Sequence, residues 1–213
     1  MTASKFLEIR EYSCGIFPCP RQNLLENTRT NLVKTGSKKK QAVKISNRKG
    51  NIVSMSNITV GISDWKVCRP TDVLITYALG SCVGSCLFDQ KAGVAGLSHI
   101  MLPDSSNLGG KDVNRMKFAD TALPDMVREM VKMGADPRRI QAKIAGGALM
   151  FAARSEQFNI GERNVAAVKQ ALAKLRIPII ASDTGLNYGR TVYFYGADGK
   201  VVIKSTVKGV NVL

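Results

Sequence analysis

The sequence predicts an α+β fold in which layered, mixed β-sheets form a sandwich-like core flanked by α-helices. Many short segments are rich in Val, Ile, Tyr and Phe and are bounded by Gly, Asp or Pro, as is typical of strands. Only two segments show the apolar spacing of three and four that indicates an amphipathic helix. Strands and helices do not alternate regularly, so mixed sheets with helices outside fit better than a parallel α/β wheel.

Eight segments have the composition of strands. They are residues 58–62, 72–78, 82–88, 93–102, 141–145, 178–182, 190–196 and 200–205. The last two flank Gly196-Ala-Asp-Gly199, and Asp-Gly favours the turn geometry that joins two twisted strands. We therefore expect a β-hairpin at this turn.

Two segments have the periodicity of helices, 115–133 and 162–175. In the first, apolar side chains recur at helical spacing up to Met133, and Gly134 follows as a stop signal. The second repeats the pattern and ends before Pro178. The methionines of the first helix are interpreted as core filling rather than as a partner-binding stripe.

The positive charge is unevenly distributed, and this predicts the domain organisation. The formal net charge is +15, and residues 1–54 hold eleven Lys or Arg against three Glu. These residues include Lys38-Lys39-Lys40 and show no regular periodicity, which is typical of a solvated, disordered extension. We expect residues 1–54 to be a basic N-terminal extension and 55–213 to be a single folded domain, with Met55 as a candidate natural start.

Composition excludes several classes of protein. No apolar run approaches the roughly 20 residues that cross a bilayer, and Glu8, Arg10 and Glu11 interrupt any secretory signal. Direct membrane insertion is therefore not expected, and the expected location is the cytoplasm. The five cysteines form no CxxC pair, and one histidine is present. A disulfide framework, a metal site and a bound cofactor are accordingly not expected.

Cys82 and His99 are the candidate nucleophile and base. Cys82 lies in Gly80-Ser-Cys-Val-Gly84, among small residues, and His99 follows 17 positions later, a separation that two neighbouring strands can span. If the side chains meet, the imidazole can accept the thiol proton and leave a nucleophilic thiolate. Backbone N–H groups of Ser81 and Val83 are candidate donors to an oxyanion. Thr76 is a candidate to orient the histidine, through its hydroxyl or its carbonyl.

Structural interpretations of the same residues stay open. A glycine-rich segment often only packs closely against another backbone, and a lone histidine on an apolar strand face is often a hydrogen-bonded core residue. Cys86 shares a strand face with Cys82 but lies deeper in the apolar run, so we expect a buried, inert thiol. Cys68 lies between Lys66 and Arg69, and we expect it to be exposed and acidified, though without a base.

Thr76 and the motifs around Cys82 and His99, together with four motifs further downstream, resemble the CheD family of chemoreceptor glutamine deamidases in bacterial chemotaxis. The resemblance covers about residues 57–208. It is carried, in order, by Thr76, Leu79-Gly-Ser-Cys82, His99-Ile-Met-Leu-Pro-Asp104, Lys117-Phe-Ala-Asp-Thr-Ala122, Ala142-Lys-Ile-Ala-Gly-Gly-Ala148, Asn159-Ile-Gly-Glu-Arg-Asn164 and Asp183-Thr-Gly185 with Gly189-Arg190. Two departures are Ala78 and Leu186, which stand where glycine is common in the family.

The resemblance implies a cysteine hydrolase that converts chemoreceptor glutamines to glutamate and releases ammonia. It implies Cys82 as nucleophile, His99 as general base and acid, and Thr76 as the orienting residue, with neither metal nor organic cofactor. It also implies a fold like that of toxin-type cysteine deamidases, chemoreceptors as substrates, and a CheC-type phosphatase as a partner of some members.

Two rival functions come from other classes. One is a non-catalytic adaptor, which would not need Thr76, Cys82 and His99 together. The other is a nucleic-acid-binding protein, suggested by the charge of +15. Aromatic residues are only 6% of the chain, and more than half of the excess charge lies in residues 1–54, so no nucleic-acid partner is expected.

Overall fold

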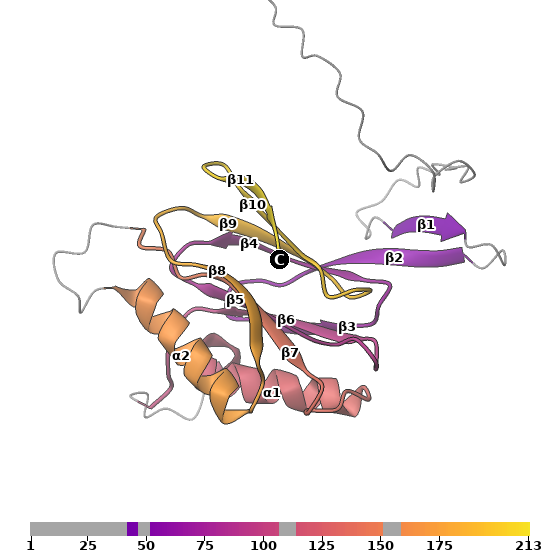
Figure 1. Cartoon of the computed structure of the whole chain (residues 1–213), viewed down its shortest axis with the longest axis horizontal. Helices are drawn as coiled ribbons and strands as arrows, with labels where there is room; N and C mark the ends of the chain where they lie inside the picture. The colour runs from indigo at the N-terminus through magenta and orange to yellow at the C-terminus, as the bar shows by residue number, and fades with distance from the viewer. Residues whose placement is uncertain (1–41, 47–51, 107–113, 151–158) are drawn as a thin grey trace, which may run out of the picture. The chain divides into compact units, whose positions relative to one another are not determined.

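The computed structural model describes residues 42–46, 52–106, 114–150 and 159–213, with side chains from residue 55 onward (Figure 1). All of these belong to the unit Gly36–Leu213. The strands are β1 (Ala42–Ser46), β2 (Ile52–Thr59), β3 (Trp65–Cys68), β4 (Val73–Leu79), β5 (Val83–Asp89), β6 (Val94–Ile100), β7 (Gln141–Gly146), β8 (Ile179–Thr184), β9 (Arg190–Tyr195), β10 (Val201–Ser205) and β11 (Gly209–Val212). The helices are a 3₁₀ turn (Arg115–Lys117), α1 (Ala119–Lys132) and α2 (Ile160–Lys174).

The strands form two mixed sheets, as the sequence predicts. One sheet has the order β1-β2-β4-β9-β10-β11 and the other has the order β3-β6-β5-β7-β8. In the first sheet β2 pairs parallel to β4, and in the second β7 pairs parallel to β8, whereas the remaining pairs are antiparallel. The α+β class with mixed sheets is therefore confirmed, and so is the β9–β10 hairpin around Gly196–Gly199.

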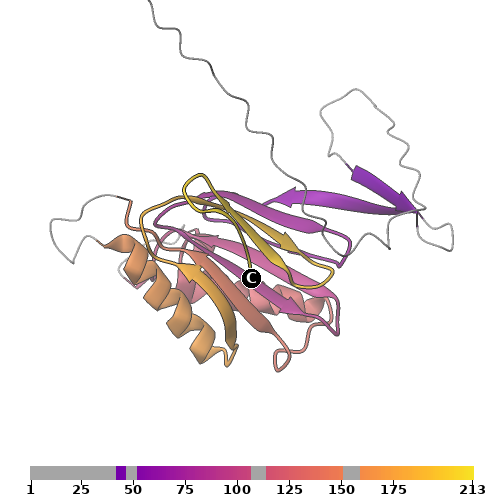
Figure 2. The ribbon, with the colours of Figure 1, turned by 45° about the horizontal axis from the view of Figure 1, so that its top comes forward.

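Two apolar clusters lie on the two faces of the five-stranded sheet. The first joins α1 and α2 to the residues of β5, β6 and β7 that include Val83, Leu87 and Ile100. The second joins those strands to β4, β9 and β10 through residues such as Cys86, Leu97 and Phe194. Figures 1 and 2 show both helices on the side of β5, β6 and β7 that faces away from β4 and β9. Because β5 and β6 are covered on both faces, every one of their residues is buried.

The two helices form where the apolar periodicity predicts them. The observed α1 begins at Ala119, after the 3₁₀ turn, and its buried residues include Met126 and Met130, which are core residues as expected. In α2, the Asn159 side chain accepts a hydrogen bond from the Glu162 amide and caps the first turn. None of the helices in the described residues is long and apolar enough to span a membrane.

Some strands differ from the sequence prediction. The segment predicted at 58–62 is β2, which begins at Ile52 and ends at Thr59, so its predicted limits are wrong. Met55 lies inside β2, so the boundary expected at residues 54/55 falls within a strand, while residues 1–41 lie outside the described part of the chain. The short strands β1, β3 and β11 were not predicted. Segments of four or five residues carry little periodicity, and their pairing with a neighbouring strand determines them.

Candidate active site

Antiparallel pairing of β5 and β6 brings Cys82 and His99 to the same side of the five-stranded sheet. Gly84 is the partner of His99, and Cys82 lies two residues before Gly84. Alternation along a strand therefore makes Cys82 a diagonal neighbour of His99 on one face, at a typical Cα separation of about 7–8 Å. Both side chains lie on the face that packs against the six-stranded sheet, where the cluster includes Leu97 and Cys86.

Thr76 of β4 contacts His99 from the opposite sheet. Its Oγ1 lies 2.8 Å from His99 Nδ1 and 2.8 Å from the carbonyl oxygen of Val60, and the Thr76 and His99 side chains are fully buried. A carbonyl can only accept, so the threonine hydroxyl donates to Val60 and accepts from Nδ1–H. This hydrogen-bond network assigns the tautomer with an unprotonated Nε2. The orienting contact expected from the Thr76 hydroxyl is thus present.

The second nitrogen of His99 is available as a base. Nε2 is buried and has no hydrogen-bond partner among the described residues, and no hydrogen bond joins it to Cys82. Burial lowers the pKa of His99 to about 4. Burial also raises the pKa of the Cys82 thiol above its usual value. At neutral pH the resting pair is therefore an uncharged thiol and an uncharged imidazole, not the resting thiolate that the sequence interpretation allowed.

Hydrogen bonds to its carbonyl groups fix the loop before β5. The Gly80 carbonyl accepts from the Ala148 amide at 2.8 Å, and the Cys82 carbonyl accepts from the Gly147 amide at 2.8 Å. The intervening Ser81 carbonyl accepts from the side chain of Asn164 at 2.9 Å. The amides of Ser81 and Cys82 have no acceptor among the described residues. Two neighbouring N–H groups beside the thiol are consequently available to an oxyanion.

The amide of Val83 is placed differently from the amides of Ser81 and Cys82. On the side of β3, the backbone N–H of His99 donates to the Asp64 carbonyl, and its C=O accepts from the Ser63 amide. Backbone groups alternate in an antiparallel ladder, so those of Ile100 face β5, where Ile100 pairs with Val83. The Val83 N–H therefore points at the Ile100 carbonyl. To donate to an oxyanion, the Val83 N–H would have to give up its hydrogen bond in the β5–β6 ladder, whereas the Ser81 N–H would not have to break one.

Asn164 is a site residue to which the sequence interpretation assigned no role. It is fully buried in α2, and its Nδ2 donates to the carbonyls of Ser81 and Met101 at 2.9 and 3.0 Å. Glycine allows α2 to approach closely enough, since a Cβ on Gly161 would lie 2.6 Å from the Ala148 carbonyl oxygen. The one signal in the sequence was the Asn159–Asn164 motif, and spacing alone did not link it to Cys82.

The other two described cysteines are buried. Cys86 is 1% exposed and burial raises its pKa, which confirms the expected inert thiol. Cys68 is 3% exposed, and burial, aided by Asp72, raises its pKa to about 12. The expectation of an exposed, acidified Cys68 is therefore wrong, because its side chain is buried in the cluster between the sheets, whereas Lys66 and Arg69 are exposed.

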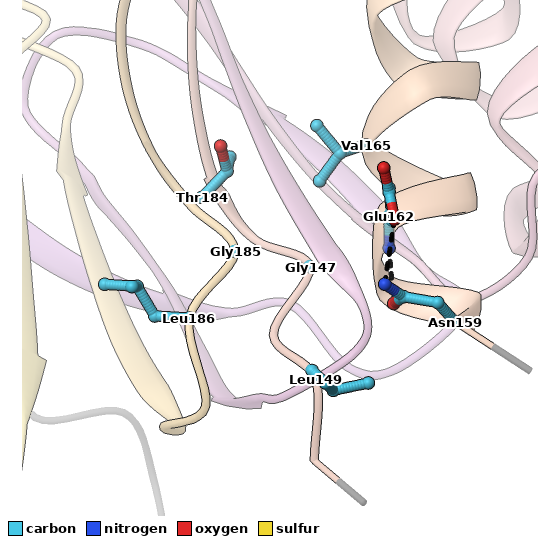
Figure 3. Close-up of a pocket in the computed structure, with 8 residues that line it drawn as sticks. All are labelled: Gly147, Leu149, Asn159, Glu162, Val165, Thr184, Gly185 and Leu186. Atoms are coloured by element: carbon cyan, nitrogen blue, oxygen red, sulfur yellow. Dashed lines mark hydrogen bonds between the residues drawn. The ribbon is translucent and has the colours of Figure 1, made fainter. Parts of the chain in front are cut away.

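A pocket of about 210 Å³ adjoins the loop that carries Cys82 (Figure 3). In the figure, Val165 and Glu162 line it from α2, and Leu149 and Leu186 from the segments that follow β7 and β8. The pocket shares Gly147 with the hydrogen bond to the Cys82 carbonyl. Within residues 55–106, 114–150 and 159–213, no group of three His, Cys, Asp or Glu side chains is arranged to hold a metal ion.

Exposed apolar side chains gather near the same loop. Met101, Leu149, Met150 and Leu186 are each at least 39% exposed, and we refer to these four as the apolar rim. Met150 packs over Gly80, and the Leu149 amide donates to the Leu186 carbonyl at 2.7 Å. The Met101 carbonyl is held by Asn164. The apolar rim is thus attached to the segments that position Cys82.

Comparisons with known proteins agree on one family. Residues 101–205 match the model of the family described as "CheD chemotactic sensory transduction". The "Probable chemoreceptor glutamine deamidase CheD" of Caldanaerobacter subterraneus subsp. tengcongensis is 50% identical over 155 residues, which cover 72% of this chain and 95% of that protein. The protein of the same description from Lachnoclostridium phytofermentans is 48% identical over 153 residues, which cover 71% of this chain and 94% of that protein.

A solved structure matches only in part. The crystal structure of the Bacillus licheniformis hypothetical protein YfiH aligns with a TM-score of 0.40 and 16% identity. The alignment covers 58% of this chain and 51% of that chain. A match this partial carries no argument about the site.

Proposed function

The chain belongs to the CheD family of chemoreceptor glutamine deamidases, and on this premise we propose that it hydrolyses chemoreceptor glutamine side chains to glutamate and ammonia with Cys82 as the nucleophile. The observation that carries the proposal is the buried Thr76–His99 hydrogen bond. It directs the unprotonated Nε2 of a unique histidine into the strand face that Cys82 shares. The hydrolysis requires water as the second substrate.

The first half-reaction forms a thioester. Sγ of Cys82 attacks the side-chain amide carbon of the glutamine while its proton passes to His99 Nε2. The π electrons of the carbonyl move to oxygen, and the amides of Ser81 and Cys82 stabilise that oxyanion. When the oxyanion collapses, the C–N bond breaks and His99 returns its proton to the departing ammonia. Thr76 acts as a positioning residue, because it holds the imidazole through Nδ1.

The second half-reaction releases glutamate. His99 Nε2 accepts a proton from water as the water oxygen attacks the thioester carbon. Collapse of this second oxyanion breaks the C–S bond, and His99 protonates the leaving sulfur to restore the thiol. His99 is neutral before and after each half-reaction, and Cys82 passes from the neutral thiol to the thioester and back, which agrees with the pKa directions of the two free groups.

The surroundings of Cys82 support a protein substrate. A glutamine side chain on a receptor helix needs an accessible sulfur, and Cys82 is partly exposed while His99 is not. The apolar rim offers exposed contacts for the apolar side chains that flank such a glutamine. We further propose that the enzyme acts in the cytoplasm, where receptor signalling helices lie.

Mass spectrometric mapping of a chemoreceptor cytoplasmic fragment tests the function. Incubation with the full chain should convert specific glutamines to glutamate, and Cys82→Ala and His99→Ala should each abolish the conversion. Cys68→Ala is a matched control that removes a buried thiol away from the site and should retain activity. Conversion that persists in Cys82→Ala would refute the assignment of the nucleophile.

A CheC-type phosphatase is proposed as a partner on family grounds. Co-elution of the purified proteins in size-exclusion chromatography should yield a complex. Separate elution at micromolar concentrations would remove this partner from the proposal.

A further inference from the structure

Asn164 connects the two chain segments that carry Cys82 and His99. Its amide nitrogen donates one hydrogen bond to the Ser81 carbonyl, one residue before Cys82, and another to the Met101 carbonyl, two residues after His99. The side chain is fully buried. No other side chain in the described residues donates hydrogen bonds to both segments.

The bond to Ser81 sets the direction of the neighbouring N–H. Ser81 C=O and Cys82 N–H belong to one trans peptide, in which the two groups point in opposite directions. Because the carbonyl points at Asn164, the Cys82 N–H points away from α2, and it meets no acceptor in the described residues. Rotation of this peptide would turn a carbonyl oxygen toward the substrate in place of a donor.

We propose that Asn164 is a positioning residue that locks the Ser81–Cys82 peptide and thereby keeps the Cys82 amide aimed at the oxyanion. The inference rests on the proposed deamidase function and assigns a role that Cys82, His99 and Thr76 do not fill. Since the Cys82 carbonyl is held by Gly147, the peptides on both sides of the nucleophile are fixed. The donor is therefore in place before substrate arrives, which is the condition for electrostatic stabilisation at no reorganisation cost.

The burial of Asn164 supports a role beyond packing. Its Oδ1 is buried and has no partner among the described residues. Leaving a polar atom buried and unpaired in this way destabilises the fold. A side chain that only filled space between α2 and the sheet would be better apolar, as Val165 and Val168 are on the same helix. The distinguishing feature of Asn164 is that its amide nitrogen holds the carbonyls of Ser81 and Met101.

The test compares variants that remove the donor with a control that weakens the same helix. Asn164→Ala removes the side chain, and Asn164→Leu removes the donor but keeps the volume. Val168→Ala is the control, because Val168 is fully buried in α2 and its apolar side chain donates no hydrogen bond to the Ser81 carbonyl. Each variant is checked for folding by its melting temperature. Deamidation of a receptor fragment is measured as kcat and KM, and Cys82 alkylation by iodoacetamide as a second-order rate.

Comparing kcat with the alkylation rate separates an effect on oxyanion stabilisation from an effect on the reactivity of the Cys82 thiol. Alkylation displaces iodide at a saturated carbon and forms no oxyanion, so it reports only the reactivity of the thiol. We expect both Asn164 variants to lose about 10- to 100-fold in kcat, somewhat less than direct removal of an oxyanion donor costs, with KM and alkylation rate within about twofold of wild type. Val168→Ala should lower the melting temperature and leave kcat unchanged.

Each alternative outcome contradicts the inference. Equal losses in alkylation and kcat would assign Asn164 to thiol reactivity, and wild-type kcat would leave it no part in catalysis. Failure of both Asn164 variants to fold would assign it to stability. A wild-type chain that does not deamidate the receptor fragment overturns the proposed function instead, and that result is visible before any variant is made.

Discussion

The hydroxyl of Thr76 lies 2.8 Å from Nδ1 of His99, where many cysteine and serine hydrolases place a carboxylate. A hydroxyl fixes the tautomer and the ring orientation as a carboxylate does, but it adds no negative charge. The Thr76 hydroxyl therefore gives no counter-charge to an imidazolium, and burial lowers the pKa of His99 to about 4.

Removal of the Thr76 hydroxyl should impair catalysis more than folding. Thr76→Val keeps the shape of the side chain but leaves Nδ1 and the Val60 carbonyl without their partner. We expect a kcat loss of about 10- to 100-fold, no larger than the low end of the roughly 10²–10⁴-fold that a general acid–base contributes, and a smaller loss than for Cys82→Ala. Thr76→Ser keeps the hydroxyl and should retain most activity. Equal activity of the Val and Ser variants would contradict the orienting role.

The pH profile of deamidation should reach unusually far toward acid. His99 acts as a base when neutral, and its pKa of about 4 keeps it neutral well below the ordinary histidine value of 6.5. We expect kcat/KM to stay nearly constant from pH 8 to about pH 5 and to fall as the pH passes through about 4. The receptor fragment must be shown to stay folded at each pH. An acidic limb centred near pH 6.5 would show that the imidazole is solvated.

The stability of the fold should also depend on His99. The pKa falls from 6.5 in the unfolded chain to about 4 in the folded protein, so between these values the unfolded chain binds more protons. The contribution of the neutral imidazole to the free energy of unfolding is fully present above pH 6.5. It decreases by about 3 kcal/mol as the pH falls toward 4. Urea titrations of the wild type and of His99→Gln should show a steeper pH dependence for the wild type. Parallel curves would rule out a buried neutral imidazole.

Gly161 should tolerate no side chain. A Cβ at this position would lie 2.6 and 2.7 Å from the carbonyl oxygens of Ala148 and Gly147, and both are backbone atoms. Gly161→Ala should therefore lower the free energy of unfolding by about 1–3 kcal/mol and lower kcat as α2 moves Asn164 away from Ser81. Ala166→Gly, at an exposed position of the same helix, should cost about 1 kcal/mol and leave kcat unchanged. A wild-type kcat in Gly161→Ala would show that catalysis does not depend on the position of α2.

The two departures from the family's glycines should carry backbone strain. Ala78 and Leu186 have φ values of 56° and 62°, in the left-handed region, and Ala78 lies in the β4 irregularity between Thr76 and Leu79. Left-handed backbone costs a residue with a Cβ about 1–2 kcal/mol, whereas glycine loses roughly 0.5–1 kcal/mol more entropy on folding. Ala78→Gly should thus stabilise the fold by about 0.5–1 kcal/mol in a urea titration. Destabilisation would mean that other contacts hold this turn.

Residue type and strand pattern were enough to select Cys82 and His99 as candidates, because the chain has one histidine and few cysteines, and the contact expected between the Thr76 hydroxyl and His99 is present. The role of Asn164 depends on α2 packing against a loop 83 residues earlier, which no local pattern encodes. Cys68 was misjudged for the same reason. Its charged neighbours in sequence are exposed, and its burial is set by strands from both sheets. The long elements were predictable from periodicity, whereas β3 and β11 exist only through their neighbours.

The raised pKa of Cys82 also affects how quickly oxidants in a cell inactivate the enzyme. Hydrogen peroxide attacks the thiolate and converts it to sulfenic acid, so a sulfur stored as the protonated thiol is oxidised slowly. In the proposed mechanism the nucleophile is generated only while a glutamine amide occupies the site, since the proton moves to His99 as the carbon is attacked. Peroxide inactivation no faster than the oxidation of free cysteine would be its measurable sign.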